Sequence, residues 1–156
     1  MDSEDDVSLN ITVREACDAD LKTLVDFNRA LAEESENLSL DKGILQLGIK
    51  KAMELEGCYY FVAELNDDVV GQSMITSEWS DWRNKVIWWI RSVYVNPDLR
   101  KRGVFTNIFK HIESLAKTKP EIKALRLYVM RSNKLGIKTY EALGMKNSGY
   151  IVYEKL

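Results

Sequence analysis

The segment VYVNPDLRKRGVF, Val93 to Phe105, joins a strand-like apolar run to the start of an amphipathic helix. Pro97 ends the strand, because proline has no amide hydrogen for a sheet ladder. The first amides of a helix lack intrahelical acceptors and lie at the positive end of its dipole, so an anion can bind there. The residues at this position are Arg100, Lys101, Arg102 and Gly103. The turn is therefore a candidate phosphate site, and a solvated basic turn is the alternative.

Hydrophobic periodicity on both sides of this segment predicts strands and helices. The downstream helix has the clearest apolar stripe: Val104, Phe105, Ile108, Phe109, Ile112, Leu115 and Ala116. The predicted strands cover 11–16, 58–65, 69–79, 85–95, 124–130 and 150–156, and the predicted helices begin near 18 and 41 and cover 104–116 and 133–143. This order, β-α-α-β-β-β-α-β-α-β, is typical of an α+β domain with a mixed sheet and helices on its faces.

Composition limits the class of protein. The 156 residues, 46% of them hydrophobic, suit one domain over 11–156 after an acidic, disordered tail over 1–10. A net charge of −2 argues against a nucleic-acid binder. Cys17, Cys58 and His111 lack the spacing of a metal-ligand set, so no metal is expected. No stretch approaches the roughly 18 apolar residues of a membrane span, and the N-terminus lacks a signal-peptide core, so we expect a cytoplasmic protein without a membrane partner.

The basic turn does not match two common phosphate motifs. The chain contains neither GKS nor GKT, as a Walker loop requires, nor the G-x-G-x-x-G of a dinucleotide fingerprint. The segment instead resembles motif A of the GNAT N-acetyltransferase superfamily, which reads Arg/Gln-x-x-Gly-x-Gly/Ala after a strand and a short turn. Arg100 and Gly103 occupy the required positions. Phe105 departs from the usual Gly or Ala, and its bulk is expected to point into the helix–sheet core.

A second GNAT motif follows at the right separation. It runs Asn-x-x-small-x-x-x-Tyr-x-x-x-Gly-Phe, and the matching residues here are Asn133, Gly136, Tyr140, Gly144 and Met145, with Met in place of Phe. Two motifs in the right structural contexts are more specific than either alone. The motifs cover 93–145, and the element order resembles the family from Ile11 onward. The chain is thus identified as a member of this superfamily, with a three-layer α/β/α fold.

The resemblance implies a site for acetyl-CoA as cosubstrate. In the family the fourth and fifth strands splay apart and open a slot for the pantetheine arm. The backbone of Val93, Tyr94 and Val95 would pair with this arm like an added strand. Asn133 would contact or help to hold the pantetheine. The pyrophosphate would bind the amides of Arg100, Lys101, Arg102, Gly103, Val104 and Phe105.

The resemblance suggests which residue is the general acid more clearly than which residue is the general base. Tyr140 matches the tyrosine that often protonates the departing thiolate; packing on the sheet is its alternative role. Many members place a glutamate eleven residues before the Arg/Gln of motif A, and that position is Trp89. Glu78, at the end of the third strand, is the first substitute, acting directly or through water, although an exposed hairpin carboxylate is the plainer reading. Asp81 is a weaker candidate, and a partly neutral amine would need little help.

The resemblance therefore implies an enzyme that transfers acetyl from acetyl-CoA to a primary amine of a small molecule or of a peptide or protein. A non-catalytic acyl-CoA-binding module is the alternative, and it would need neither Tyr140 nor a base. Nucleic-acid binding through RKR is disfavoured by the overall acidity. The expected partners are acetyl-CoA, an amine acceptor and a second copy of the chain, since the last strand could mediate a homodimer. Glu33, Glu34 and Glu36, near the acceptor site in the family, would attract a cationic amine.

Overall fold

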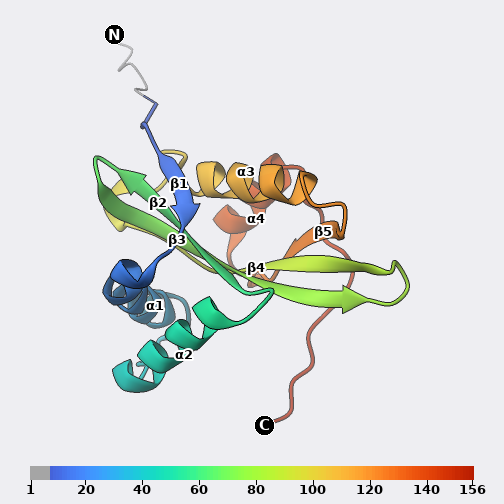
Figure 1. The fold of residues 1–156 in the computed structure, drawn as a ribbon, viewed down its shortest axis with the longest axis horizontal. Coiled ribbons are helices and arrows are strands. Elements are labelled where there is room, and N and C mark those ends of the chain that lie inside the picture. The colour runs from blue at the N-terminus through green and yellow to red at the C-terminus, as the bar shows by residue number, and fades with distance from the viewer. Residues whose placement is uncertain (1–7) are drawn as a thin grey trace.

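A five-stranded sheet lies at the centre of residues 8–156, the part of the chain described in the computed structural model (Figure 1). The strands lie side by side in chain order: β1 (Thr12–Glu15), β2 (Tyr59–Leu65), β3 (Asp68–Ser80), β4 (Lys85–Val95) and β5 (Ile122–Leu127). Neighbours are antiparallel from β1 to β4, whereas β4 and β5 are parallel. The mixed, mostly antiparallel sheet confirms the predicted α+β class.

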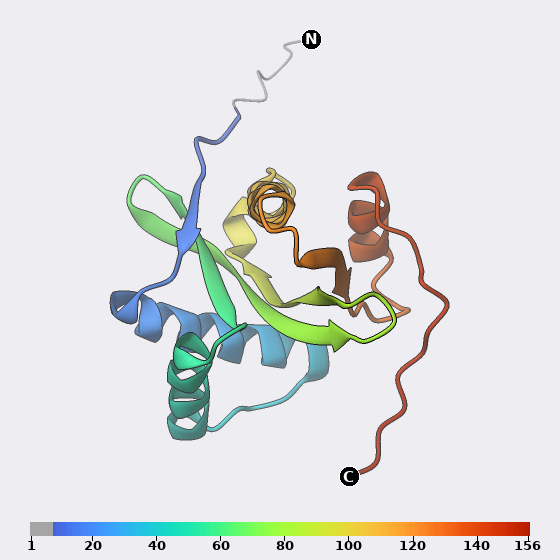
Figure 2. The ribbon, with the colours of Figure 1, turned by 45° about the vertical axis from the view of Figure 1, so that its right-hand side comes forward.

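Two helices lie on each face of the sheet (Figure 2). On one face are α1 (Leu21–Glu36) and α2 (Lys42–Glu54), and on the other are α3 (Val104–Lys117) and α4 (Lys134–Ala142). Short 3-10 turns, η1 (Asp18–Asp20) and η2 (Pro97–Leu99), precede α1 and α3. The fold is therefore the expected three-layer α/β/α arrangement.

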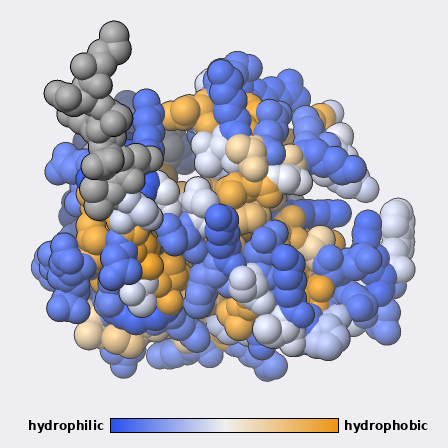
Figure 3. Space-filling model, turned by 90° about the horizontal axis from the view of Figure 1, so that it is seen from above, coloured by the Kyte–Doolittle hydropathy of each residue, from blue (hydrophilic) through white to orange (hydrophobic). Residues whose placement is uncertain are grey.

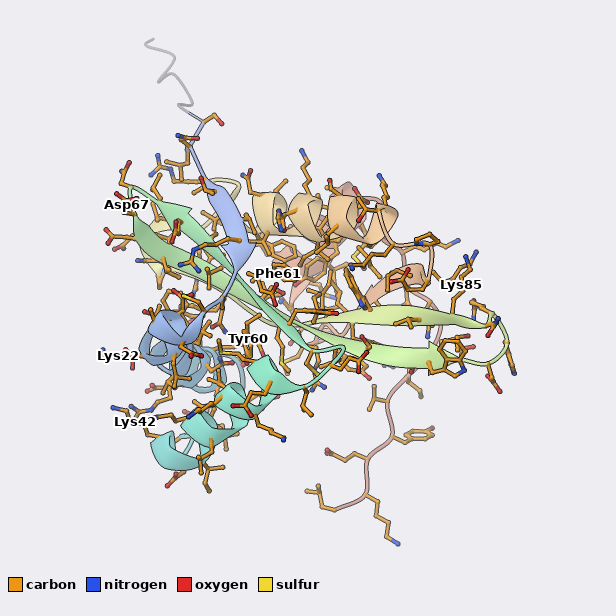
Figure 4. The ribbon with its side chains drawn as sticks, viewed as in Figure 1. Lys22, Lys42, Tyr60, Phe61, Asp67 and Lys85 are labelled. Atoms are coloured by element: carbon orange, nitrogen blue, oxygen red, sulfur yellow. The ribbon has the colours of Figure 1, made fainter. Side chains whose placement is uncertain are left out.

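Alternation along β2 gives the sheet two cores, because successive side chains of a strand point to opposite faces. Phe61 packs in the cluster on the α3 side, and Tyr60 packs in the cluster on the α1–α2 side (Figure 4). Both side chains are at most 5% exposed. Fully burying one large apolar side chain contributes about 1.5–3 kcal/mol, so these two clusters hold the helices against the sheet.

The surface of the domain is mostly hydrophilic on the α3 side (Figure 3). Seen from above, the α3 side shows hydrophobic residues only in gaps between hydrophilic ones (Figure 3). No helix within residues 8–156 has the length and apolar character needed to cross a bilayer. The first seven residues of the expected acidic tail lie outside the described residues, whereas Leu9 and Ile11 pack against the α3-side core.

The C-terminal end differs from the prediction. The strand expected over 150–156 is not formed, and the chain runs away from the sheet there (Figure 1). An extended segment without a neighbouring strand has no ladder to hold its backbone amides. The strand expected over 124–130 is also displaced: β5 covers Ile122–Leu127, because its pairing with β4 stops at Leu127.

Candidate active site

The central feature is a divergence between β4 and β5. Their pairing stops at Ile90 opposite Leu127, yet β4 continues for five residues to Val95. The side chains of Val93 and Val95 pack in the α3-side core, and Tyr94 contacts Phe27 of α1, with ring centroids 5.0 Å apart. These three side chains are therefore packed within the domain, while the edge of the β4 backbone that faces β5 has no strand partner beyond Ile90. An extended ligand can add to such an edge like a strand.

A β-bulge lies at the start of the divergence. Gln72 of β3 is opposite Tyr94, but Met74 is opposite Arg91, so β4 has one extra residue here. Ser92, within the bulge, has a φ of 50°, a left-handed value that is uncommon for any residue except glycine. A bulge releases backbone groups from the ladder and re-aims them. The bulge therefore interrupts the regular β3–β4 ladder where β4 leaves β5.

A buried polar network holds this bulge. Gln72 is fully buried, and its Nε2 donates to the carbonyl of Ser92 at 3.0 Å. Asn28 of α1 donates through Nδ2 to the Leu24 carbonyl at 2.8 Å and lies 3.5 Å from Gln72 Oε1. Ser73 Oγ donates to the carbonyl of Arg91 at 3.3 Å. Satisfied buried polar networks favour one unique arrangement, so the bulge geometry is fixed before any ligand arrives.

The turn before α3 has the geometry of an anion site. Gly103 is the N-cap residue, with a φ of 84°, and it offers no side chain to cap the helix. A Cβ added there would meet only Asn107 Nδ2, at 3.9 Å, so the backbone conformation and not crowding requires glycine. Lys101 and Arg102 are exposed beside it. The first amides of α3 are thus accessible to an anionic group.

Arg100 is not directed at this helix start. Its Nε donates to the Val95 carbonyl at 3.0 Å, and its Nη2 lies 2.8 Å from Glu34 Oε2. The guanidinium also lies over the Tyr94 ring, 5.3 Å from the centroid. Burial first, and the Glu34 charge second, raise the pKa of Tyr94. Arg100 therefore joins the end of β4 to α1, and Glu34, expected to attract an amine, is already paired.

Asn133 and Gly136 form the start of α4. Asn133 Oδ1 accepts a hydrogen bond from the Gly136 amide at 2.9 Å and caps the helix. A Cβ on Gly136 would lie 2.6 Å from Asn133 Nδ2, so any side chain at this position would push against the capping amide of Asn133. The Asn133 side chain thus has a capping role, and its expected contact with pantetheine stays a prediction.

Tyr140 brings the two motifs together. Its ring lies edge-on to that of Phe105, with centroids 5.6 Å apart and planes at 77°. Phe105 in turn packs in the α3-side core, as its departure from the motif suggested. Burial raises the pKa of the Tyr140 hydroxyl above its ordinary value of about 10. The hydroxyl is therefore protonated at neutral pH and can donate a proton.

Glu78 lies on the other face of the sheet. It follows Met74 by four residues along β3, and Met74 packs on the α1–α2 side, so both side chains point to that side. Glu78 Oε2 is 3.6 Å from Arg126 Nη1 of β5, and the Glu78 side chain is 48% exposed. The guanidinium of Arg126 also lies over the ring of Trp89. Glu78 and Tyr140 thus flank the diverging strands from opposite faces.

The other carboxylate candidate has a local role. Asp81 Oδ1 accepts from the Trp82 amide at 2.9 Å in the exposed turn between β3 and β4. Trp89, at the position where many relatives have a base, stacks on Tyr128 with centroids 4.4 Å apart. Trp88 points to the opposite face and is buried, as expected for adjacent strand residues.

Comparison with known proteins gives the family. The sequence model of the acetyltransferase (GNAT) family matches residues 24–145, most of the chain. The chain belongs to this family. Its cosubstrate is acetyl-CoA, and it is an acyltransferase. The diverging strands and the uncapped start of α3 suit an extended arm that ends in a pyrophosphate.

Three relatives illustrate the range of this GNAT fold. The chain is 29% identical over 147 residues to the thialysine N-epsilon-acetyltransferase of Bos taurus, covering 88% of this chain and 85% of that one. The structure of a "possible acetyltransferase" from Clostridium difficile 630 has 40% identity and a TM-score of 0.86, with 94% and 97% coverage. A "predicted acetyltransferase with acetyl-CoA" from Clostridium acetobutylicum has 20% identity, a TM-score of 0.77, and 93% and 96% coverage, which shows the fold alone.

The sequence did not predict the buried polar residues that hold the strands of the GNAT site in place. The motifs predicted where a slot would lie, but neither the bulge at Ser92 nor the buried Gln72 and Asn28 were predicted. A signal was present, because Gln72 and Ser73 interrupt the apolar strand VVGQSMI. Polar side chains within a buried strand require partners, and here those partners are carbonyls of the neighbouring strand.

Proposed function

We propose that this GNAT protein transfers the acetyl group of acetyl-CoA to a primary amine of a small molecule or of a peptide or protein. The observation that carries the proposal is the divergence of β4 from β5 after Ile90 and Leu127. It leaves Val93–Val95 without a strand partner on the β5 side, where the pantetheine arm would add, although Arg100 Nε already donates to the Val95 carbonyl. The start of α3 lies one short turn further along the chain. The Bos taurus relative, named for acetylating an amine, supports this class of acceptor.

The reaction needs one bond made and one broken. The amine nitrogen attacks the thioester carbonyl carbon, a C–N bond forms, and the C–S bond then breaks. The departing thiolate takes a proton, and the nitrogen loses one. Backbone N–H groups at the bulge around Ser92 would donate to the carbonyl oxygen as its negative charge grows, because preorganised donors stabilise such charge.

Tyr140 is the proposed proton donor to the thiolate. Its pKa, raised by burial, keeps the phenol protonated at neutral pH. Phe105 fixes its ring, and Phe105 lies in the first turn of the helix proposed to bind the pyrophosphate. A positioned acid typically accelerates such a step by roughly 10²–10⁴-fold.

Glu78 is the proposed acceptor of the amine proton, directly or through water. Its carboxylate is exposed and lies beside Arg126 on the face away from Tyr140. In this arrangement the amine approaches from the α1–α2 side and the thiolate leaves toward the α3–α4 side. Glu78 would thus take the proton from the attacking amine, and Tyr140 would give one to the leaving thiolate.

The test is release of free thiol from acetyl-CoA in the presence of different acceptors. The panel includes thialysine and lysine, after the Bos taurus relative, aminoglycosides, after a structural neighbour bound to sisomicin, and lysine-containing peptides. We expect saturable turnover with at least one primary amine and none with its N-acetylated form. Binding of acetyl-CoA without turnover on any amine would instead support the non-catalytic acyl-CoA-binding alternative.

A further inference from the structure

Arg126 of β5 lies on the side of the sheet from which the acceptor amine is proposed to approach. It is opposite Trp89 of β4, and Trp89 is opposite Thr76 of β3. Directly opposite residues point to the same face of a sheet, and Thr76 points the same way as Met74, which packs on the α1–α2 side. The hairpin end of β3 and β4 extends beyond α1 and α2 (Figure 1). The side chain of Arg126 therefore belongs to the acceptor side of the site.

Aromatic rings hold the guanidinium of Arg126. Its central carbon lies over the ring of Trp89, 5.9 Å from the centroid, and over that of Tyr150, at 5.8 Å. Trp89 in turn stacks on Tyr128, with centroids 4.4 Å apart. A ring attracts a cation through its negative face, whereas the N–H groups of a guanidinium lie in its own plane. The rings thus fix the orientation of the guanidinium without using its donors.

The donors of Arg126 are poorly satisfied by the protein. The guanidinium makes no hydrogen bond within residues 8–156, since the nearest carboxylate atom, Glu78 Oε2, is 3.6 Å from Nη1. The Arg126 side chain is only 27% exposed, so water reaches a small part of it. A planar guanidinium can bind the two oxygens of a carboxylate with two parallel hydrogen bonds. Arg126 is therefore suited to a carboxylate that arrives with a ligand.

The charges around Arg126 also favour an anion. Arg91 of β4 is opposite Met74, so it points to the same side as Trp89, and it is exposed. These two arginines have Glu78 as the carboxylate beside them on β3, and this part of the face is positive. A positive surface raises the local concentration of an anionic ligand. An acceptor with amino groups alone would gain nothing from it.

We infer that the acceptor amine carries a carboxylate, as a free amino acid does, and that Arg126 binds this carboxylate. The inference rests on the proposed acetyl transfer and names the class of its acceptor. Arg126 immediately precedes Leu127, the last residue of β5 that pairs with β4, so the bound carboxylate lies where the two strands diverge. Trp89 supports the arginine. Arg126 thus determines specificity, and it takes no part in the proton transfers assigned to Glu78 and Tyr140.

The first test compares acceptors with and without a carboxylate. Lysine, alanine and phenylalanine are each assayed against their carboxamides, and lysine also against 1,5-diaminopentane. We expect kcat/KM to be roughly tenfold to hundredfold higher for the carboxylates, the range of a hydrogen bond between charged groups. Arg126→Gln should lower this ratio by at least about tenfold, and Arg126→Lys should retain only part of it, because lysine lacks the planar fork.

The ratio separates carboxylate binding from an effect through Glu78. Loss of Arg126 also changes the surroundings of the Glu78 carboxylate, but that change acts on every amine and cancels in the ratio. The matched control is Arg83→Gln in the exposed turn between β3 and β4, which should keep the ratio of the wild type. Equal losses for the two kinds of acceptor in Arg126→Gln would show that Arg126 only supports Glu78, and would overturn the inference.

The second test does not require turnover. Binding of lysine and of 1,5-diaminopentane to the protein saturated with CoA is measured by isothermal titration calorimetry. We expect lysine to bind more tightly to the wild type and to lose this advantage in Arg126→Gln. Such binding without turnover of any amine would refute the proposed acetyl transfer and leave the carboxylate site standing. Turnover of amines with no preference for a carboxylate, in either assay, would refute the site and leave acetyl transfer standing.

Discussion

The ring of Tyr140 on α4 lies edge-on to the ring of Phe105 on α3, with centroids 5.6 Å apart. The contact joins the residue proposed to protonate the thiolate to the first turn of the helix proposed to bind the pyrophosphate. The phenylalanine that replaces the usual small residue of the motif thus contacts the ring of the proposed acid and would fix its orientation.

Replacement of Phe105 by Leu should loosen Tyr140 without emptying the core. Such a swap typically costs on the order of 1 kcal/mol in the free energy of unfolding. We expect kcat to fall several-fold while the KM for acetyl-CoA changes little. The control is Phe109→Leu, one turn further along α3, which should lower stability without lowering kcat. Equal effects of the two substitutions on kcat would show that Phe105 does not orient the acid.

Gly103→Glu should abolish binding of acetyl-CoA, because it places a carboxylate where the pyrophosphate is expected. The assay is the rise in melting temperature on addition of acetyl-CoA, since a ligand that binds only the folded state stabilises it. Gly48→Glu is the charge-matched control, as Gly48 lies in α2 with no atom within 4 Å of an added Cβ. We expect the rise in wild type and in the control only. A full rise in Gly103→Glu would place the site elsewhere.

The sequence predicted the divergence of two strands beside the basic turn, but not the side-chain pairs around it, for a physical reason. The roles of Gly103 and Gly136 depend on local backbone geometry, which a short motif encodes. The pairing of Arg100 with Glu34, and of Arg126 with Glu78, joins side chains that are distant in sequence, and spacing along one element does not reveal it. The C-terminal segment has the composition of a strand, but composition does not say whether a partner strand is present.

Gln72→Met should test the network under the bulge. Methionine keeps the approximate volume but leaves the Ser92 carbonyl without its donor. An unsatisfied buried carbonyl costs about 1–3 kcal/mol, measurable by urea denaturation. Because the bulge then relaxes, kcat should also fall at temperatures where the protein remains folded. A loss of stability with unchanged kcat would limit Gln72 to a structural role.

The ion pair between Arg14 and Asp20 predicts how stability depends on pH. Arg14 Nη1 is 2.8 Å from Asp20 Oδ2, and this hydrogen bond holds the pKa of Asp20 below its usual value. The pair therefore contributes stability above the unfolded carboxyl pKa of about 3.9, and this contribution is lost as the pH falls toward the lower folded pKa. Asp20→Asn should be less stable than wild type by about 1–3 kcal/mol at pH 7, and the difference should shrink at low pH. A difference that stays constant with pH would contradict this.

The central claim is that Tyr140 acts as the acid in acetyl transfer, and the most direct measurement is kcat of Tyr140→Phe with acetyl-CoA and the best amine of the panel. The substitution removes the hydroxyl and keeps the ring against Phe105, so the fold and acetyl-CoA binding should survive. We expect kcat to fall by at least about tenfold, at the low end of the range for general acids, with near-normal acetyl-CoA stabilisation. An unchanged kcat would contradict the account and leave Tyr140 a packing residue.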